Sequence, residues 1–351
     1  MVKVSIIVLN FNQKEYTINC VESLLKQSFK DFEIIIIDNF SNDNSYELFI
    51  DNFKNNPKIK IFKTNENRGY AGGNNFGVEK ANGDYIAILN NDTVVDENWL
   101  YWLIKGLESD ENVKIVGAIM PILKNSEKID FSKKSVTLSL TGATVFYSKK
   151  NEKKSDFERV FSAGGCAFIY DRSIIDLPFL NDYFAYGEDT YFNWFVNLKG
   201  YKVVKSINAR GIHFHNAVRK NSNKRFNNYL LYLSERNLLI NFYIFFSFKS
   251  ILKISPLMFL RGAAYNLYYL NRIPSNFRAY LWILLHPKFI FKTRKKIQSE
   301  RKVTDKEIIK LMSYKIYEIN RITGFKTALQ IFNNFSKFYC KIFNIKTVEL
   351  S

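Results

Sequence analysis

The chain of 351 residues is 47% hydrophobic and 24% charged, with a formal net charge of +18. This apolar content is sufficient for a packed core and excludes a chain that is disordered throughout. The positive charge favours a partner that carries phosphate, such as a nucleotide, a nucleic acid or an anionic membrane.

The three cysteines, Cys20, Cys166 and Cys340, lie far apart in the sequence. Their odd number and wide spacing exclude a disulfide framework and a cysteine metal site, and they favour a reducing compartment. No stretch reaches the roughly 18 uncharged apolar residues of a membrane-spanning helix. The short apolar run at 4–9 is interpreted as a strand rather than a signal peptide. We therefore expect a cytoplasmic protein, peripheral on the inner face of the cell membrane.

The first 120 residues alternate between predicted strands and predicted helices. The strands are continuous apolar runs, as expected of strands covered on both faces. Repeated βα units predict an α/β fold with a Rossmann-like, mainly parallel sheet and helices on both faces. Strands are expected at 4–9, 32–37, 59–62 and 85–89, and helices at 14–27, at 44–53 and up to about 82.

Beyond residue 120 the pattern becomes less regular. We expect strands within 135–146 and 160–170, a helix at 189–199 and a short strand at 201–206. These elements are interpreted as the second half, 121–237, of one domain that covers 1–237.

The C-terminal region, 238–351, is predicted to be helical and basic. Between Lys249 and Lys302 there are twelve Lys or Arg residues and one acidic residue, Glu300, interleaved with aromatic and aliphatic residues. This composition predicts basic amphipathic helices that lie on an anionic membrane surface. The alternative is a helical appendage that packs on the core and has a solvated basic face. No nucleic-acid-binding motif is present, so no nucleic-acid partner is expected.

Polar residues follow two of the predicted strands. Asp38 ends the second strand, and Asn90-Asn91-Asp92 follows the fourth. The carboxyl ends of parallel strands border the ligand crevice of such sheets. Asp38 is expected to accept hydrogen bonds from a base or ribose, and Asp92 is the carboxylate best suited to a divalent cation on a diphosphate. The alternative is that both segments are ordinary turns that end strands.

A Gly- and Asn-rich segment, 65–75, contains four Asn and three Gly residues. We predict a turn that permits close approach of the backbone to a ligand, followed by a helix whose free N–H groups bind an anion. The glycine spacing does not match the dinucleotide fingerprint. A plain loop is the alternative.

Two further groups carry acids and imidazoles. Glu188-Asp189 opens a predicted helix after an aromatic segment, 183–186, that is suited to pack against a sugar ring. A carboxylate there is a candidate general base, although acids at a helix start also complement the helix dipole. His213 and His215 share one face if the segment is a strand. Either completes a metal site with Asp92, unless the two form a structural pair.

Taken in order, these groups resemble the family 2 inverting glycosyltransferases, which have the GT-A fold. The rhamnosyltransferase-like members, which build surface polysaccharides, are the most similar, and the resemblance covers residues 3–237. Residues 5–12 resemble the family's opening strand and first nucleotide contact, and residues 67–75 resemble its N-x-G-[FY]-A-G-G-N-N signature. Residues 90–92 stand where the family has its D-x-D metal motif, and residues 188–189 stand where it has its E-D pair.

The resemblance implies a role for each group. Asp189 is implied to be the catalytic base, with Glu188 beside it. Asp92 is implied to hold Mg²⁺ or Mn²⁺ together with His213, which precedes an Arg-Asn pair (Arg236-Asn237) as in the family, and His215 is the alternative ligand. The residues implied to bind the nucleotide sugar are Asn10, Phe11, Asp38, Asn67, Gly69, Gly72, Asn74 and Asn91.

The implied reaction is the transfer of one sugar, with inversion, from a dTDP- or UDP-sugar to a glycan or lipid-linked acceptor. Residues 1–120 are then the nucleotide-sugar-binding half and 121–237 the acceptor half. The first acid of the metal motif is Asn90 here, so metal binding depends on Asp92 and a histidine. The chain lacks a Gln-x-x-Arg-Trp segment, which argues against a processive synthase.

Two other functions stay open at this point. A sugar-phosphate nucleotidyltransferase uses a related α/β sheet, but it usually has a Gly-rich loop after the first strand, and residues 10–14 contain no glycine. A non-catalytic nucleotide-sugar-binding protein would not need the acids and histidines that this chain retains.

Overall fold

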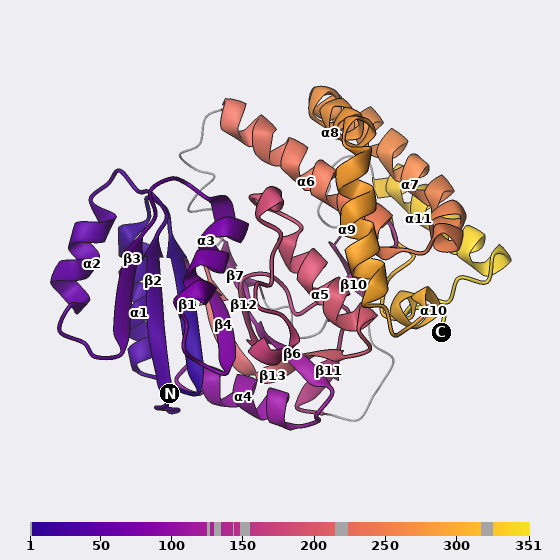
Figure 1. The fold of residues 1–351 in the computed structure, drawn as a ribbon. Coiled ribbons are helices and arrows are strands. Elements are labelled where there is room, and N and C mark those ends of the chain that lie inside the picture. The colour runs from indigo at the N-terminus through magenta and orange to yellow at the C-terminus, as the bar shows by residue number, and fades with distance from the viewer. Residues whose placement is uncertain are drawn as a thin grey trace.

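The computed structural model describes residues 2–124, 127–129, 135–142, 144–147, 155–214, 224–316 and 326–351. A large sheet with the order β3-β2-β1-β4-β12-β6-β13-β7-β8 forms its centre (Figure 1). The strands of this path are β1 (Val4–Asn10), β2 (Phe32–Asp38), β3 (Ile59–Lys63), β4 (Tyr85–Asn90), β6 (Val113–Ile119), β7 (Ile122–Lys124), β8 (Glu127–Ile129), β12 (Ala167–Asp171) and β13 (Lys202–His213). Outside this path lie β5 (Thr93–Val95), β9 (Ser135–Leu138), β10 (Thr144–Tyr147) and β11 (Phe157–Arg159).

The strand directions confirm the predicted mainly parallel sheet. β3, β2, β1 and β4 run parallel, and the polar residues Asn10 and Asp38 are paired at the ends of β1 and β2. β12 is antiparallel to both β4 and β6, and β6 is parallel to β13. The ends of β1, β2 and β4 therefore meet at one edge, where sequence reasoning expects the ligand.

Both faces of the sheet are buried, which explains the unbroken apolar strands. Ile7 and Ile37 pack against α3 (Gly69–Glu79) on one face, in a core that also includes residues of α5 (Glu188–Leu198). Ile6 and Val8 pack on the other face with α1 (Lys14–Leu25), α2 (Ser45–Phe53) and α4 (Trp99–Glu108). Alternate residues of each strand thus serve different cores.

Two elements differ from the prediction. α3 begins at Gly69, inside the segment expected to be a turn, because its glycines pack on the sheet. A Cβ at Gly73 would lie 2.5 Å from a methyl group of Leu9, and one at Gly77 would lie 2.5 Å from Ile7. β13 is longer than the strand expected at 201–206, because its far end pairs with β5.

The C-terminal helices pack beside α6 (Lys224–Phe245), on the side away from α2 (Figure 1). They are α7 (Phe248–Tyr268), α8 (Ile273–Leu285), α9 (Pro287–Ser299), α10 (Asp305–Ile309) and α11 (Lys326–Ile342). Position 237, the expected domain boundary, lies within α6, so one continuous helix carries residues of both proposed regions.

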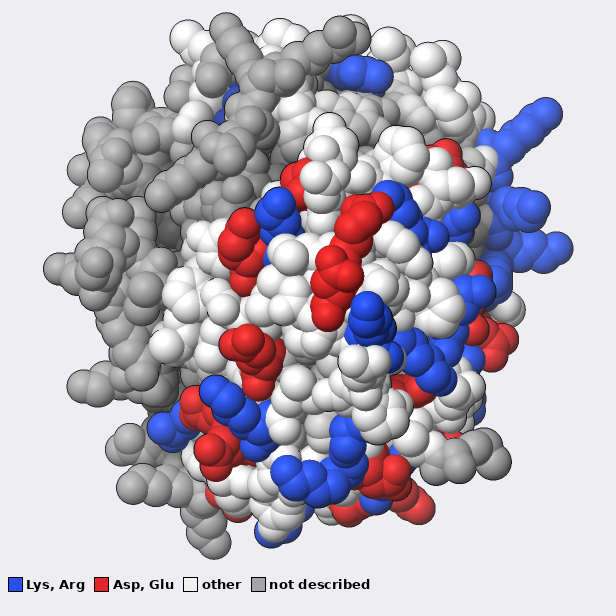
Figure 2. Space-filling view, turned by 90° about the vertical axis from the view of Figure 1, so that its left-hand side faces the viewer, with Lys and Arg blue, Asp and Glu red and all other residues white. Residues whose placement is uncertain are grey.

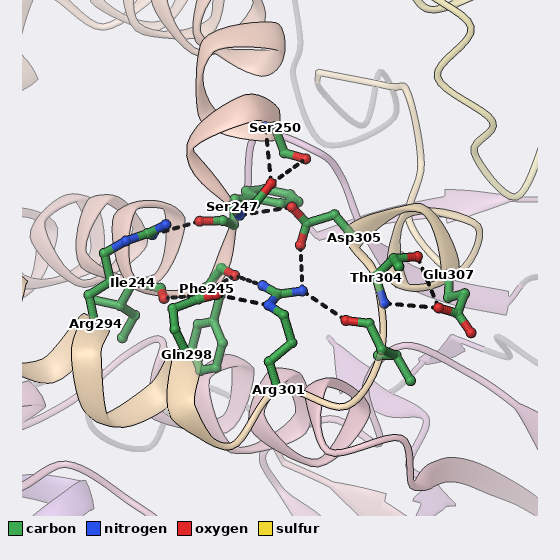
Figure 3. Close-up of polar contacts among 12 residues, drawn as sticks. Ile244, Phe245, Ser247, Ser250, Arg294, Gln298, Arg301, Thr304, Asp305 and Glu307 are labelled. Atoms are coloured by element: carbon green, nitrogen blue, oxygen red, sulfur yellow. Dashed lines mark hydrogen bonds and ion pairs between the residues drawn. The ribbon is translucent and has the colours of Figure 1, made fainter.

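Side chains of α9 and of the turn after it cap the end of α6 (Figure 3). The last carbonyls of a helix lack intrahelical partners. Arg294 donates to the carbonyl of Phe246 at 2.6 Å, and Gln298 donates to those of Ile244 and Phe245 at 2.8 Å each. Arg301 donates to the carbonyl of Phe245 as well. The C-terminal region therefore fixes α6, which in turn contacts the candidate site described below.

Both signs of charge occur on the face nearest α2 and β3, where acidic and basic side chains are interspersed (Figure 2). Within the described part of the chain, no helix combines the length and the apolar character needed to cross a bilayer.

Candidate active site

A cleft of about 510 Å³ lies at the carboxyl ends of β1 and β4. Its volume is within the range of small-molecule and cofactor sites. Seven of the residues that sequence reasoning selected line this cleft: Phe11, Asn67, Gly69, Asn91, Asp92, Glu188 and Asp189.

Asp92 and His213 form a close pair. The Asp92 Oδ1 atom lies 3.0 Å from His213 Nε2, because β13 pairs with β5 and sets His213 opposite Thr93. Burial disfavours the charged imidazole, but hydrogen bonds to the Asp92 carboxylate and the Cys166 thiol outweigh it and raise the pKa of His213 to about 10. His215 lies outside the described residues.

This pair fits a divalent cation that is delivered with a diphosphate. Within the described ranges, no group of three or more His, Cys, Asp or Glu side chains forms a complete metal site. One carboxylate oxygen and one deprotonated imidazole nitrogen are ligands that Mn²⁺ accepts, so the cation would displace the proton that His213 shares with Asp92. Substrate phosphates commonly complete such a coordination sphere.

Glu188 and Asp189 open α5 at the other wall of the cleft. Glu188 is 7% exposed, and its Oε2 atom has no hydrogen-bond partner among the described residues. Asp189 accepts a hydrogen bond from the Thr190 backbone N–H at 2.7 Å. Burial raises the pKa of both carboxyls, and the charge of Asp189 raises that of Glu188 further.

The raised pKa of Glu188 predicts a stability that depends on pH. The folded-state pKa exceeds the ordinary value of 4.5. The contribution of protonated Glu188 to the free energy of unfolding is therefore complete below pH 4.5 and is lost as the pH rises through the folded-state pKa. We expect Glu188→Gln to raise the free energy of unfolding at pH 8 by about 1–3 kcal/mol, with the gain shrinking toward pH 5.

Urea unfolding of both proteins at pH 5 and pH 8 measures this effect. Glu235→Gln is the matched control, because Glu235 is equally buried but pairs with Arg261. That variant is expected to be destabilised. A Glu188→Gln protein that is less stable than the wild type at pH 8 contradicts the argument.

Residues of α6 hold the loop before Glu188 in place. Asn237 Nδ2 donates to the carbonyls of Tyr183, Ala185 and Tyr186 at 3.0, 3.0 and 2.6 Å. The backbone of Tyr186 has a φ of +66°, a strained value for a residue other than glycine. The Arg236-Asn237 pair therefore supports the loop that precedes Glu188.

The Gly/Asn signature supports the same loop from the side of α3. Gly69 has a φ of +67°, and a Cβ there would lie 2.4 Å from the Phe184 carbonyl oxygen. Asn75 Nδ2 donates to the Phe179 carbonyl at 2.8 Å and to Asn181 at 2.7 Å. The signature thus joins α3 to the loop before α5, across sequence separations of 104 and 106 residues.

Four predicted donor residues lie outside the cleft lining. Asn74 donates to the Tyr70 carbonyl of its own helix at 2.9 Å, and Gly72 faces the Arg68 side chain. Asn10 and Asp38 are buried and hydrogen-bonded to each other at 3.1 Å.

A chain of hydrogen bonds nevertheless links Asn10 and Asp38 to the cleft. Thr17 donates to Asn10 at 2.8 Å, and Asn91, which lines the cleft, donates to Thr17 at 3.0 Å. Asp38 therefore lies behind the wall of the cleft and is linked through Asn10 and Thr17 to Asn91, which lines the cleft.

Other residues that line the cleft were not among the predicted site residues. Tyr70 donates to Asn90 Oδ1 at 3.0 Å and to the Gly165 carbonyl at 2.6 Å. Asn39 lines the cleft and donates to Asn67 and to the Gly69 carbonyl at 3.1 Å each. Asn39 directly follows Asp38, so its place after a strand was a usable signal, whereas no pattern identified Cys166.

The sequence is similar to those of glycosyltransferases. Residues 5–177 match the model of glycosyl transferase family 2. The glycosyltransferase GlyG of Streptococcus pneumoniae is 30% identical over 114 residues, which are 32% of this chain and 38% of that protein. A dolichyl N-acetyl-alpha-D-glucosaminyl phosphate 3-beta-D-2,3-diacetamido-2,3-dideoxy-beta-D-glucuronosyltransferase of Methanococcus voltae is 26% identical over 218 residues, which are 58% of this chain and 64% of that protein. The chain spans less than two thirds of the length of either relative.

Solved structures are similar over nearly the whole chain. S. aureus TarS 1-349 in complex with UDP-GlcNAc has a TM-score of 0.55 at 13% identity, over 97% of this chain and 92% of that one. The mannosyltransferase PcManGT from Pyrobaculum calidifontis, in complex with GDP-Man and Mn²⁺, has a TM-score of 0.51 at 14% identity, over 96% and 86%.

The chain therefore has the GT-A fold of glycosyltransferases. Its residues 5–177, just under half of the chain, match the model of glycosyl transferase family 2. The fold and the family resemblance that the motifs implied agree with these findings.

Proposed function

We propose that the protein is a glycosyltransferase that moves one sugar from a nucleotide-diphosphate sugar to an acceptor hydroxyl with inversion. The observation that carries the proposal is a single cleft lined by two partly buried acids, Asp92, which contacts His213 at 3.0 Å, and Asp189. The match of residues 5–177 to the model of glycosyl transferase family 2 supports the same reaction.

The donor is proposed to lie in the cleft with its base near Phe11 and its diphosphate near Asp92. Asp92 and His213 would hold Mg²⁺ or Mn²⁺, and the cation would stabilise the negative charge that develops on the leaving diphosphate. Asn67, Gly69 and Asn91 are proposed donor contacts, while Asn10, Asp38, Gly72 and Asn74 are proposed to position them.

Asp189 is proposed to act as the general base. It accepts the proton of the acceptor hydroxyl while that oxygen bonds to the anomeric carbon and the bond from this carbon to the diphosphate oxygen breaks. A single displacement from the opposite face inverts the anomeric configuration. The raised pKa of Asp189 makes it a stronger base than an exposed aspartate.

A panel of nucleotide sugars tests the proposal. We expect at least one dTDP-, UDP- or GDP-sugar to raise the melting temperature and to be slowly hydrolysed, in both cases more strongly with Mn²⁺. Pyrophosphate release from a nucleoside triphosphate and a sugar phosphate, without any turnover of nucleotide sugars, would instead identify a nucleotidyltransferase.

The proposed pathway is surface polysaccharide or glycolipid assembly. The name of the Methanococcus voltae relative includes a dolichyl N-acetyl-alpha-D-glucosaminyl phosphate, which supports a lipid-linked acceptor. A dTDP- or UDP-linked hexose or deoxyhexose, rhamnose included, is the proposed donor.

The C-terminal helices are proposed to bind the anionic inner face of the cell membrane. Large apolar side chains protrude from them, among them Phe259 at 80% and Leu284 at 75% exposure. The surrounding sequence is rich in Lys and Arg, so the surface combines the apolar and the cationic attraction that an interfacial helix uses.

Cosedimentation with vesicles measures this association. We expect binding to vesicles that contain phosphatidylserine, weaker binding to vesicles of phosphatidylcholine alone, and at least a tenfold loss in a Phe259→Asp/Leu284→Asp variant. Tyr101→Asp, which changes an exposed aromatic of α4, is expected to bind as the wild type does. Equal binding by the double variant would refute the proposed surface.

A further inference from the structure

Apolar side chains gather on the outside of three C-terminal helices. Most of the large hydrophobic side chains that are exposed in the described part of the chain lie beyond residue 247. We call the clearest of them the outer face: Leu252 and Phe259 of α7, Leu281 and Leu284 of α8, and Phe335 and Phe338 of α11. Exposed apolar patches of this kind mark interaction surfaces.

α7 and α11 lie next to each other (Figure 1) and run antiparallel. Tyr339, near the end of α11, donates a hydrogen bond to the carbonyl of Lys253, near the start of α7, at 2.9 Å. Leu329, near the start of α11, shares a buried cluster with Ala264, near the end of α7.

The exposed side chains of α7 and α11 lie on the same side of this pair. Phe259 directly precedes Leu260, which packs in the shared cluster, and Phe338 directly precedes Tyr339, which bonds to α7. One residue is a rotation of about 100° in an α-helix, so both exposed side chains are turned from the line of contact in the same sense. In two antiparallel helices this turn points to the same side, so α7 and α11 share one apolar surface.

α7 and α8 expose their apolar side chains away from α6. Arg261 of α7 pairs with a buried carboxylate of α6, and Ser275 of α8 donates to a backbone carbonyl of α6 at 3.2 Å. Phe259 is two residues from Arg261, and Leu284 is nine residues from Ser275. These separations are rotations of about 200° and 180°, so both side chains lie opposite α6, on the outside of the molecule.

The charge of these helices indicates what covers the outer face. The sequences of α7, α8, α9 and α11 contain no Asp or Glu, and Lys249, Lys337 and Lys341 are exposed on α7 and α11. Apolar side chains accompanied by cations alone complement an anionic lipid surface. A second copy of the chain would instead bring like charges together across the contact, which is unfavourable.

We infer that α7, α8 and α11 lie in the plane of the membrane interface and insert the outer face among the acyl chains of an anionic bilayer. The inference rests on the membrane association given under Proposed function. It adds the face that enters the bilayer, the part of α11 in it, and the manner of binding, which is apolar insertion rather than attraction of charges alone.

The dependence of vesicle binding on salt tests the manner of binding. Cosedimentation of the whole chain with vesicles of phosphatidylserine and phosphatidylcholine is measured in about 0.1 M and about 1 M NaCl, which shorten the screening length from about 10 Å to about 3 Å. We expect wild-type binding to fall less than threefold, because salt does not screen apolar burial. A loss of tenfold or more would show attraction of charges alone and overturn the inference.

Two matched variants of α11 locate the face. Phe335→Ser/Phe338→Ser is expected to lose at least tenfold in binding at both salt concentrations, because it removes two large apolar side chains. Lys337→Gln/Lys341→Gln changes exposed residues of the same helix, and it is expected to weaken binding in 0.1 M NaCl but not in 1 M NaCl. Wild-type binding by the double serine variant overturns the inference.

A fluorescence measurement keeps the test independent of any loss of binding. Phe335→Trp adds an indole to the four of the wild type, and we expect lipids with brominated acyl chains to quench the added fluorescence. Tyr101→Trp, at an exposed position of α4, is the control, and its added fluorescence is expected to stay unquenched. Equal quenching of the two variants, or of neither, contradicts insertion of the outer face.

The outcomes separate the proposals. Vesicle binding that 1 M NaCl abolishes, or that the double serine variant retains, overturns the insertion and leaves the membrane association of the proposed function standing. A wild-type protein that binds no vesicle removes both membrane proposals and leaves sugar transfer untouched. A lipid-free dimer that the double serine variant converts to a monomer would identify a second copy as the occupant and overturn the inference.

Discussion

Asp189→Asn is expected to lose about 10²- to 10⁴-fold in kcat, the usual contribution of a general base. The amide is nearly isosteric with the carboxylate, but it cannot accept the proton of the attacking hydroxyl. Donor binding is expected to change by less than threefold, since the amide leaves Asp92 and His213 untouched. Steady-state kinetics with the identified donor, combined with calorimetry, separates these two effects.

Asp182→Asn is the matched control for this experiment. Asp182 is exposed and belongs to the same loop, and only its backbone carbonyl contacts Arg236. It is expected to retain wild-type kcat. Wild-type turnover by Asp189→Asn would remove Asp189 from the role of base.

Asp92→Ala is expected to abolish the dependence of donor binding on the divalent cation. Asp92 is the carboxylate of the proposed cation pair, and His213 alone supplies at most one neutral ligand nitrogen and no negative charge. We expect Mn²⁺ to strengthen donor binding by the wild type at least tenfold and to leave binding by the variant unchanged. Calorimetry with and without Mn²⁺ gives both affinities.

Asp96→Ala controls for the loss of a nearby acid. Asp96 is exposed just after β5, outside the cleft lining, and its replacement is expected to preserve the response to Mn²⁺. Identical affinities of the wild type with and without Mn²⁺ would contradict the metal-dependent part of the proposal.

Much of the sheet was predictable because its strands are buried on both faces. β1, β2 and β4 have continuous apolar runs that end in polar residues. The convergence of Asp92 with Asp189 follows from strand order and from the loop before α5. The start of α3 was not predictable, because Gly73 packs against Leu9, a contact about 64 residues away that no local pattern encodes.

The supports of the site were also beyond local patterns. Asn237 bonds to carbonyls 51 to 54 residues away, and Asn75 bonds across 104 residues. Asp38 illustrates a further case, since its position at a strand end predicted contact with a ligand, and that contact stays a prediction. Its burial and its hydrogen bond from Asn10 depend on the packing of neighbouring strands, which no local pattern encodes.

The central claim is a single displacement at the anomeric carbon, driven by Asp189 while the diphosphate leaves. Proton NMR of the product formed from an α-linked nucleotide sugar and a neutral methyl glycoside tests it most directly. The account predicts a β-linked product as the first species to appear. An α-linked first product would mean retention of configuration and would contradict the mechanism.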